Sequence, residues 1–536
     1  MTKSSHVTMS HSSVVILDYG SQYTQLIARR VRELGIYSVI LPGDAKRERI
    51  ESFHPKALIL SGGPSSVYDQ GAPQLPEGFK DLRAKGLPVL GVCYGMGLLV
   101  QLMGGEMKSS KTREYGRMEV RPDSGSRFFG HAQAFQGWMS HGDSVSRAPS
   151  GFKVVAKSES GAVAAIEDPE QGLYGIQFHP EVTHTEGGKE IYRRFLVELA
   201  GIKPDWSMAS VLDEQLKIIR DKVGPDDHVM CALSGGVDSA VAAMLVHKAI
   251  GDRLHCVFVD HGMLRYEEQA RVMKMFKDTL HLPVRCMDAS ERFLSKLAGV
   301  VDPEKKRKII GAEFIGCFED AANDLKAELG RMPAYLVQGT LYPDVIESSP
   351  APQSGGSQGF KHSTTIKSHH NVGGLPERLP FKLIEPLREL FKDEVRELGK
   401  QLGVPVGFLK RHPFPGPGLA VRIIGEITRP HLDILRLVDE VFIESIKEEG
   451  LYDQIWQAMA IFLPIKSVGV QGDGRTHDHV VALRAVTSSD GMTADWFAFD
   501  PKFLAKVSTR ICNQVRGVNR VVYDISSKPP ATIEWE

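Results

Sequence analysis

The stretch CALSGGVDSA, from Cys231 to Ala240, sets the expected fold for the middle of the chain. An apolar run precedes it and a helix-like segment follows it, so its serines and glycines lie on a strand-to-helix turn. Backbone N–H groups on such a turn can approach an anion, and the helix dipole adds positive potential. Serine and aspartate are also good helix caps, but the two glycines favour an anion site. The loop has no lysine to grip a γ-phosphoryl group, so it suits a diphosphate that leaves as a unit.

The motif S-G-G-x-D-S resembles the loop of the ATP pyrophosphatase family. That resemblance implies cleavage of ATP between the α- and β-phosphates and transfer of AMP to a carbonyl oxygen. Phe258-Val-Asp260 ends the next strand, where such folds recognise adenosine. Asp238 is expected to help place Mg²⁺. The expected ATP-binding residues are Ser234, Gly235, Gly236, Val237, Asp238, Ser239, Val259 and Asp260.

Alternating strands and helices predict an α/β fold of two doubly wound parallel-sheet domains followed by a small α+β dimerisation domain. The predicted bounds are 12–203 for the first domain, 207–403 for the second and 404–536 for the third. The second domain would resemble the adenine-nucleotide α-hydrolases. Residues 351–375 are rich in Gly, Ser and Gln and are expected to form an active-site lid.

Composition excludes several classes of function. The 65 basic and 66 acidic residues give a net charge of −1, so no global field favours nucleic acid or an anionic membrane. None of the six cysteines forms a C-x-x-C pair, and their scatter favours reduced thiols in the cytoplasm. The polar N-terminus and the lack of a long apolar run predict neither a signal peptide nor a membrane span.

A second centre is predicted at Gly91-Val-Cys93-Tyr-Gly95, which follows a strand and opens a helix. G-x-C-x-G in this setting is a nucleophile elbow, and the helix N-terminus favours the thiolate. His179 and Glu181 lie two residues apart on a strand and share one face, as a base and the carboxylate that orients it would. N–H groups of Gly63 and Tyr94 are placed to stabilise an oxyanion.

Residues 14–200 resemble the class I glutamine amidotransferase domain, with Cys93, His179 and Glu181 as its triad. The resemblance implies hydrolysis of glutamine through a γ-glutamyl thioester, with release of ammonia. Gly97 stands where the family has glutamine, and is the one departure from its pattern. The expected oxyanion- and glutamine-binding residues are Gly62, Gly63, Tyr94, Ser140 and His141.

Nearly the whole chain, 14–536, resembles the glutamine-hydrolysing GMP synthases. The matching motifs include QGTLYPDVIE from Gln338, HPFPGPGL from His412 and KPPATIEWE from Lys528. The resemblance implies a homodimer that adenylates the C2 oxygen of XMP and replaces it with an amino group. The implied XMP-binding residues are Arg307, Gln457, Arg520, Lys528, Ile533 and Glu534, and the implied lid residues are Lys367, His369 and His370.

Three other functions remain open at this stage. An NAD synthetase would use a different glutaminase domain and lack the terminal tail. A tRNA-thiolating pyrophosphatase would need a basic surface and paired cysteines. A non-catalytic nucleotide sensor is favoured only by Gly97 and opposed by the complete triad.

Overall fold

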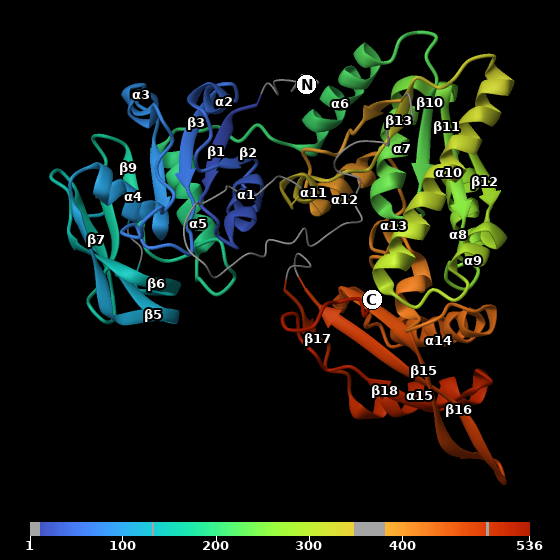
Figure 1. Cartoon of the computed structure of the whole chain (residues 1–536). Helices are drawn as coiled ribbons and strands as arrows, with labels where there is room; N and C mark the ends of the chain where they lie inside the picture. The colour runs from blue at the N-terminus through green and yellow to red at the C-terminus, as the bar shows by residue number, and fades with distance from the viewer. Residues whose placement is uncertain (1–10, 131–132, 348–380, 489–492) are drawn as a thin grey trace. The chain divides into compact units, whose positions relative to one another are not determined.

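The computed structural model of the chain divides it into two compact units, one up to Val211 and the other from Leu212 onward (Figure 1). No helix among the described residues is both long and apolar enough to cross a lipid bilayer. The structure describes residues 11–130, 133–347, 381–488 and 493–536.

A nine-stranded mixed sheet forms the centre of the first unit. Its strands in sheet order are β2 (Tyr37–Pro42), β1 (Ser13–Asp18), β3 (Pro55–Leu60), β4 (Val89–Val92), β9 (Leu173–Ile176), β8 (Val163–Asp168), β7 (Lys153–Ser158), β5 (Glu106–Pro122) and β6 (Phe135–Arg147). The first five are parallel, and their continuous apolar runs are buried. The last four pair antiparallel, and β6 alternates buried and half-buried residues. The predicted parallel sheet is therefore confirmed, with an antiparallel extension.

Helices connect and cover the strands of this sheet. They are α1 (Thr24–Arg32), α2 (Arg47–Glu51), α3 (Phe79–Ala84), α4 (Tyr94–Leu102) and α5 (Gly188–Arg193), which continues as a π-helical turn over Arg194–Leu199. Only one residue, Cys93, separates β4 from α4. This short connection places Cys93 at the carboxyl end of the parallel strands.

The second unit contains a five-stranded parallel sheet. Its strands in sheet order are β12 (Val284–Asp288), β11 (Leu254–Asp260), β10 (Val229–Leu233), β13 (Tyr335–Val337) and β14 (Lys382–Ile384). From β10 the chain moves outward through β11 and β12, then returns to β13 on the other side. The strand order therefore reverses beside β10, which is where open α/β sheets bind ligands.

Helices of the second unit flank this sheet (Figure 1). They are α6 (Met208–Lys222), α7 (Val237–Ile250), α8 (Glu268–Lys274), α9 (Ser290–Leu297), α10 (Pro303–Leu329), α11 (Tyr342–Glu347), α12 (Lys392–Gln401) and α13 (Val406–Leu409). Asp302 caps α10 by accepting a hydrogen bond from the Lys305 backbone N–H at 2.8 Å, and Pro303 occupies the first turn. Apolar residues of α9 and α10 share one core with Met230 of β10 and Val257 of β11.

A four-stranded sheet completes the second unit. Its strands are β15 (Gln457–Gln471), β16 (Gly474–Thr487), β17 (Asp495–Trp496) and β18 (Val518–Tyr523). The helices of the same segment are α14 (Arg429–Glu448) and α15 (Pro501–Gln514). β15 and β16 form an antiparallel hairpin, and β18 pairs parallel with β16. One continuous apolar core runs from Met230 of β10 to Val507 of α15, across the predicted boundary at 403/404.

Candidate active sites

Cys93 lies on a strained turn between β4 and α4. Its backbone has a φ of +52°, a region that non-glycine residues rarely adopt. Glycines flank it because side chains do not fit: a Cβ on Gly91 would overlap the Gly95 backbone, and a Cβ on Gly95 would overlap the Leu60 carbonyl. The predicted nucleophile elbow is the geometry that the structure shows.

His179 links Cys93 to Glu181 in a buried triad. Its Nδ1 lies 2.7 Å from Glu181 Oε1, and Tyr192 donates a hydrogen bond to the other carboxylate oxygen at 3.1 Å. Burial lowers the pKa of His179, but the charge of Glu181 and hydrogen bonds with Cys93 and Glu181 outweigh it and hold that pKa well above its ordinary value. The ring therefore holds a proton more firmly than a free imidazole does, and it lies where it can donate that proton.

The loop after β3 packs against this elbow. A Cβ on Gly62 would lie 3.1 Å from His179 Cε1, and one on Gly63 would lie 3.4 Å from Tyr94 Cγ. The Ser61 carbonyl accepts the Gly95 backbone N–H at 3.1 Å, which ties the loop to the first turn of α4. Glycine backbone is thus held beside the nucleophile, where an oxyanion would form.

The S-H-G-D segment lies on β6, and its two predicted residues have different surroundings. The Ser140 carbonyl accepts a hydrogen bond from Cys93 Sγ at 3.6 Å. Both ring nitrogens of His141 are occupied, Nε2 by Glu114 Oε2 at 3.0 Å and Nδ1 by the Asp143 carbonyl at 2.9 Å. Burial lowers the pKa of His141. His141 therefore joins β5 to β6 in this structure.

Gln177 was not among the residues predicted from sequence. Its Nε2 lies 3.8 Å from Cys93 Sγ, and its buried Oε1 has no hydrogen-bond partner in the part of the chain that the structure describes. The predicted strand does not reach these residues: β9 ends at Ile176, and Gln177, His179 and Glu181 lie on the segment that follows it.

Gly97 lies on α4, one turn after the nucleophile. A Cβ at this position would lie 2.8 Å from Val67 Cγ1, so the Val67 side chain already fills the adjacent space. Gln101, one turn further on, donates to the Val67 carbonyl at 3.2 Å. The loop after β3 therefore packs directly against α4 at Gly97, where the helix has no side chain.

The S-G-G-V-D-S loop joins β10 to α7 at the point where the strand order reverses. Gly235 has a φ of +77°, a conformation that favours glycine, and a Cβ there would make a tight contact of 3.3 Å with Val272 Cγ2. Ser234 and Ser239 pair through their hydroxyls at 3.1 Å, which closes the loop on itself. Gly236 is the N-cap of α7, so that N–H groups of the first turn point into the loop.

A lysine from a distant helix approaches this loop. Lys392, the first residue of α12, places Nζ 3.6 Å from Asp238 Oδ2. The sequence could not indicate this pairing, because the two positions lie far apart in the chain. Asp238 Oδ1 is buried and has no partner among the described residues. No group of three or more metal-ligating side chains occurs in the described residues. Mg²⁺ takes one or two protein carboxylates plus substrate phosphates, so this unpaired oxygen fits the ion.

Val259 and Asp260 end β11, beside the same edge of the sheet. Val259 is buried, and Asp260 Oδ1 accepts a hydrogen bond from the Gly262 backbone N–H at 2.9 Å. Asp260 is in register with Asp288 of β12. β11 is the immediate neighbour of β10, so both predicted ATP segments lie at carboxyl ends of adjacent strands.

Four of the predicted XMP residues meet around the C-terminal tail. Gln457 Nε2 donates to Glu534 Oε1 at 2.6 Å, and Ile533 packs on the face of the sheet formed by β15 and β16. Arg307 of α10 donates to the Glu536 carbonyl. The sequence missed Arg422, whose Nη2 and Nε reach the Glu534 carboxylate at 2.9 Å and 3.1 Å.

The other two predicted XMP residues have separate contacts. Arg520 Nε donates to Ser467 Oγ at 3.1 Å, and the Lys528 backbone pairs with Ala494 in both directions. The lid residues Lys367, His369 and His370 lie outside the described residues.

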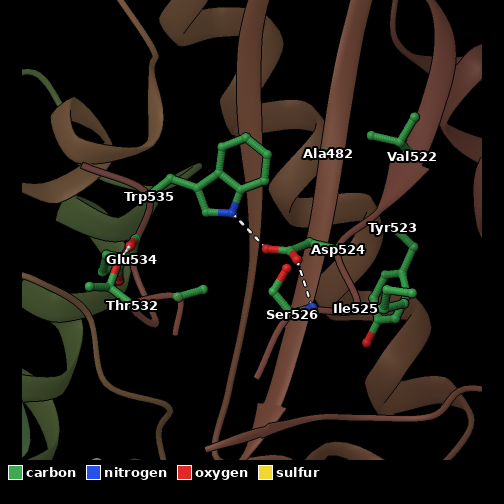
Figure 2. A pocket seen from close by; sticks show the side chains of 10 residues that line it. Ala482, Val522, Tyr523, Asp524, Ile525, Ser526, Thr532, Glu534 and Trp535 are labelled. Atoms are coloured by element: carbon green, nitrogen blue, oxygen red, sulfur yellow. Dashed lines mark hydrogen bonds between the residues drawn. The ribbon is translucent and has the colours of Figure 1, made fainter. Parts of the chain in front are cut away.

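A pocket of about 530 Å³ lies between the tail and β18 (Figure 2). Figure 2 shows the Trp535 indole pointing at Asp524, to which its Nε1 donates at 2.9 Å. Glu534 and Thr532 line the same side of the pocket as Trp535, and Tyr523, Asp524 and Ile525 line the other side. The pocket thus borders the residues predicted to contact XMP.

Comparisons with known proteins match each part of the chain. The model for class I glutamine amidotransferases matches residues 15–199, and the model for the GMP synthase C-terminal domain matches residues 444–535. Residues 227–297 match the tRNA methyl transferase HUP domain model. The first unit is therefore a class I glutamine amidotransferase domain, and the second unit contains a HUP domain that includes β10, β11 and β12.

Relatives that match this chain along almost its whole length identify the protein family. The chain is 55% identical over 98% of its length to all of the GMP synthase [glutamine-hydrolyzing] of Chlorobium phaeobacteroides. It is 54% identical to that of Chlorobaculum tepidum, covering 98% of this chain and 99% of the relative, and 53% identical to that of Aquifex aeolicus, covering 98% and 100%. The chain belongs to the family of glutamine-hydrolysing GMP synthases.

Proposed function

We propose that this chain makes GMP from XMP, ATP and glutamine through two reaction centres, one on each unit. The first centre releases ammonia from glutamine, and the second adenylates XMP and exchanges the adenylate for an amino group. The observation that carries the proposal is a complete Cys–His–Glu triad in a chain that also holds a lysine-free phosphate loop. The full-length relatives named above support the same overall reaction.

At the first centre, the Cys93 thiolate attacks the side-chain amide carbon of glutamine. N–H groups of Gly63 and Tyr94 stabilise the oxyanion, with Gly62 shaping the loop and the Ser140 carbonyl lining the approach. The His179 imidazolium gives its proton to the departing nitrogen, so ammonia leaves and a γ-glutamyl thioester remains. His179 then takes a proton from water, which attacks the thioester and releases glutamate. Glu181 holds the ring throughout, and His141 supports the strand that carries Ser140.

At the second centre, the loop from Ser234 to Ser239 holds the β- and γ-phosphates of ATP. The C2 oxygen of XMP attacks the α-phosphorus, the bond to the β-phosphate oxygen breaks, and diphosphate leaves. Ammonia then attacks C2, and AMP departs with the former C2 oxygen. Val259 and Asp260 border the adenosine, and Lys392 adds positive charge beside the loop.

Asp238 would hold Mg²⁺ at this centre. When bound, the ion neutralises charge on the leaving diphosphate. The unpaired Asp238 Oδ1 beside a phosphate loop supports this assignment.

Arg307, Gln457, Arg520, Lys528, Ile533 and Glu534 are proposed to bind XMP. Support comes from the contacts that already join Gln457, Glu534 and the Arg307 segment at the tail. Arginine and lysine suit the nucleotide phosphate, and the carboxylate and amide suit ribose or base edges. Lys367, His369 and His370 would close over the bound substrates.

We also propose that the chain forms a two-fold homodimer through residues 404–536. The β15–β16 hairpin exposes Ile465, Val468 and Val470, with Val470 at 76% exposure. Exposed apolar residues that gather on one hairpin are typical of a subunit interface. Sedimentation of the wild type and of a Val470→Glu variant tests this, because a charge at the interface should shift the protein toward monomer, whereas a wild type that sediments as a monomer would contradict the proposal.

A reducing compartment such as the cytoplasm suits this chain. All six cysteines are free, and Cys93 must remain a thiol for the proposed chemistry. Loss of glutamine-dependent activity on mild oxidation, with recovery on reduction, is the expected behaviour.

The test of the overall reaction is product analysis. Incubation with XMP, ATP, Mg²⁺ and glutamine should yield GMP, AMP, diphosphate and glutamate in equal amounts. Formation of ADP and orthophosphate would show that the second centre transfers a γ-phosphoryl group and would overturn the proposal. Omission of XMP controls for simple ATP hydrolysis.

A further inference from the structure

Three basic side chains are completely buried in the part of the chain that the structure describes. They are Lys306 of α10, Arg422 at the end of a 3₁₀ turn (Gly418–Arg422), and Arg484 of β16. A buried cation is tolerated only when it is paired and hydrogen bonded. All three find partners in one short segment, residues 532–536.

Arg484 holds the backbone of this segment. Its Nη2 and Nε donate to the carbonyls of Thr532 and Ile533, each at 2.9 Å. Its Nη1 donates to Asp524 Oδ2 at 2.8 Å, and the same carboxylate oxygen accepts the Trp535 indole N–H. Arg484 therefore joins the tail to the end of β18 through fixed, directional bonds.

Arg422 holds the Glu534 side chain. The guanidinium makes two parallel bonds to the carboxylate, stacks 5.1 Å from the Phe414 ring centre, and has Asp439 Oδ1 3.7 Å from Nη1. Burial lowers the pKa of Arg422, but the charge of Glu534 outweighs it and raises that pKa. A bidentate pair fixes the plane of a carboxylate as well as its position.

Lys306 holds the last residue of the sequence. Its ammonium donates to the Ile423 carbonyl at 2.7 Å and to Glu536 Oε2. Glu536 Oε1 accepts the Gly425 backbone N–H at 3.3 Å, and Arg307 donates to the Glu536 carbonyl. The Lys306 and Glu536 side chains are both buried, and that of Glu536 is only 6% exposed.

The tail lies outside the regular secondary structure. No described helix or strand follows β18, and none of the residues 524–536 is fully buried. Ile533 makes the apolar contact with the sheet. The three buried cations therefore hold 532–536 together with hydrogen bonds to Gln457, Arg307, Gly425 and Asp524.

We propose that Lys306, Arg422 and Arg484 form a cation clamp, a set of positioning residues that holds 532–536 so that Glu534 meets XMP in a fixed orientation. The inference deepens the proposed function and rests on its assignment of Ile533 and Glu534 to the XMP site. The clamp itself touches the tail and does not need to touch substrate. Loss of a clamp contact should weaken XMP binding and leave ATP binding and glutamine hydrolysis unchanged.

The first test is Glu536→Gln, which keeps the shape of the side chain but leaves the buried Lys306 without its counter-charge. We expect hydrogen exchange of residues 526–536 to become about 10-fold faster, because the tail opens more often. With ammonium as nitrogen source, KM for XMP should rise about 10-fold or more, since a buried charge has lost its partner. KM for ATP and XMP-independent glutamine hydrolysis should stay within about twofold. Glu328→Gln, which removes an exposed pair with Arg285, is the matched control and should change neither tail exchange nor KM.

A second pair of variants separates charge pairing from general damage. Lys306→Met alone leaves Glu536 unpaired, whereas Lys306→Met with Glu536→Met removes both charges and leaves apolar groups of similar size. The double variant should bind XMP more tightly than Lys306→Met, because no buried charge is left alone. A merely structural loss would make the double variant the weaker of the two, and that result would overturn the clamp.

Two further outcomes are decisive. If tail exchange and KM for XMP are both unchanged in Glu536→Gln, the clamp does not exist. If exchange rises while KM for XMP stays constant, the tail is clamped but does not serve XMP, and the proposed XMP roles of Ile533 and Glu534 fail. Failure of the wild type to form GMP would overturn the proposed function itself, whatever the tail does.

Discussion

The two reaction centres differ in how complete they are without substrate. Cys93, His179 and Glu181 are all buried, and each polar group of the histidine and the carboxylate has a partner within the chain. The phosphate loop has the opposite character. Ser234 and Gly236 are exposed, and Asp238 carries a buried oxygen without a partner among the described residues.

Chemistry explains this difference. Glutamine is a small, overall neutral substrate, so the protein must itself supply the charges that activate the thiol and the leaving nitrogen. ATP brings several negative charges and a cation with it. A loop that binds them benefits from a carboxylate oxygen without an internal hydrogen-bond partner among the described residues, such as Asp238 Oδ1, because an internal partner would compete with the ligand. On the proposed function, the first centre is preorganised by the fold and the second is completed by its substrates.

The variant that separates the centres most strongly is Cys93→Ala. It should lower glutamine-dependent GMP formation about 10⁴-fold or more, because no other group can form the thioester. Activity with ammonium should remain within about twofold, since the second unit is unchanged. Steady-state rates with each nitrogen source measure both effects. Cys286→Ala, at an exposed cysteine of the second unit, is the control, and loss of ammonium-dependent activity in Cys93→Ala would show that the centres are not independent.

Asp238→Asn tests whether the second centre depends on a charged ligand. Removal of one charge that faces the leaving diphosphate should lower the ammonium-dependent rate about 10²-fold and raise the Mg²⁺ concentration needed for half-maximal rate. Glutamine hydrolysis in the absence of XMP should be unaffected. Asp252→Asn, an exposed position at the opposite end of β11, serves as control. An unchanged Mg²⁺ dependence would remove Asp238 from the metal site.

Glu181→Gln tests the internal charge of the first centre through pH. The pKa of His179 is raised in the folded protein, so glutamine hydrolysis should persist well above pH 6.5 and fall as pH rises through the raised value. The stability that the His179–Glu181 pair contributes is likewise complete below 6.5 and lost across that same range.

Without the carboxylate charge the pKa of His179 should fall, so the alkaline limit of kcat/KM should move to lower pH and the rate should drop about 10- to 100-fold. A pH–rate profile of ammonia release measures the shift. The same alkaline limit in wild type and variant would show that another group controls it.

Lys392→Met tests whether ATP binding at the phosphate loop depends on this lysine of α12. KM for ATP should rise about 10-fold, because one positive charge next to the loop is lost. Lys400→Met on the same helix removes an exposed lysine paired with Glu397, and should leave KM for ATP unchanged. Equal effects of the two substitutions would indicate a change in helix stability instead.

Local motifs were enough to predict much of this molecule. The glycines at 91 and 95 appear where a side chain would overlap neighbouring backbone, and Gly235 appears at a positive φ, so the elbow and the loop could be recognised from spacing alone. Buried apolar runs such as Val14–Leu17 predicted the parallel strands, and the comparisons confirm the family, the fold class and the reaction class. The antiparallel part of the first sheet was harder to predict, since β5 and β6 are long, polar and defined by pairing between distant segments.

Several contacts between distant segments could not be predicted from the sequence. Lys392 beside Asp238, Arg422 on Glu534 and Lys306 on Glu536 join positions separated by more than a hundred residues. The sequence determined which chemical groups this protein carries and the local turns that expose them, because those depend on neighbours along the chain. Only the tertiary structure decided which charges meet, because the packing around a buried cation determines which partner lies within reach of it.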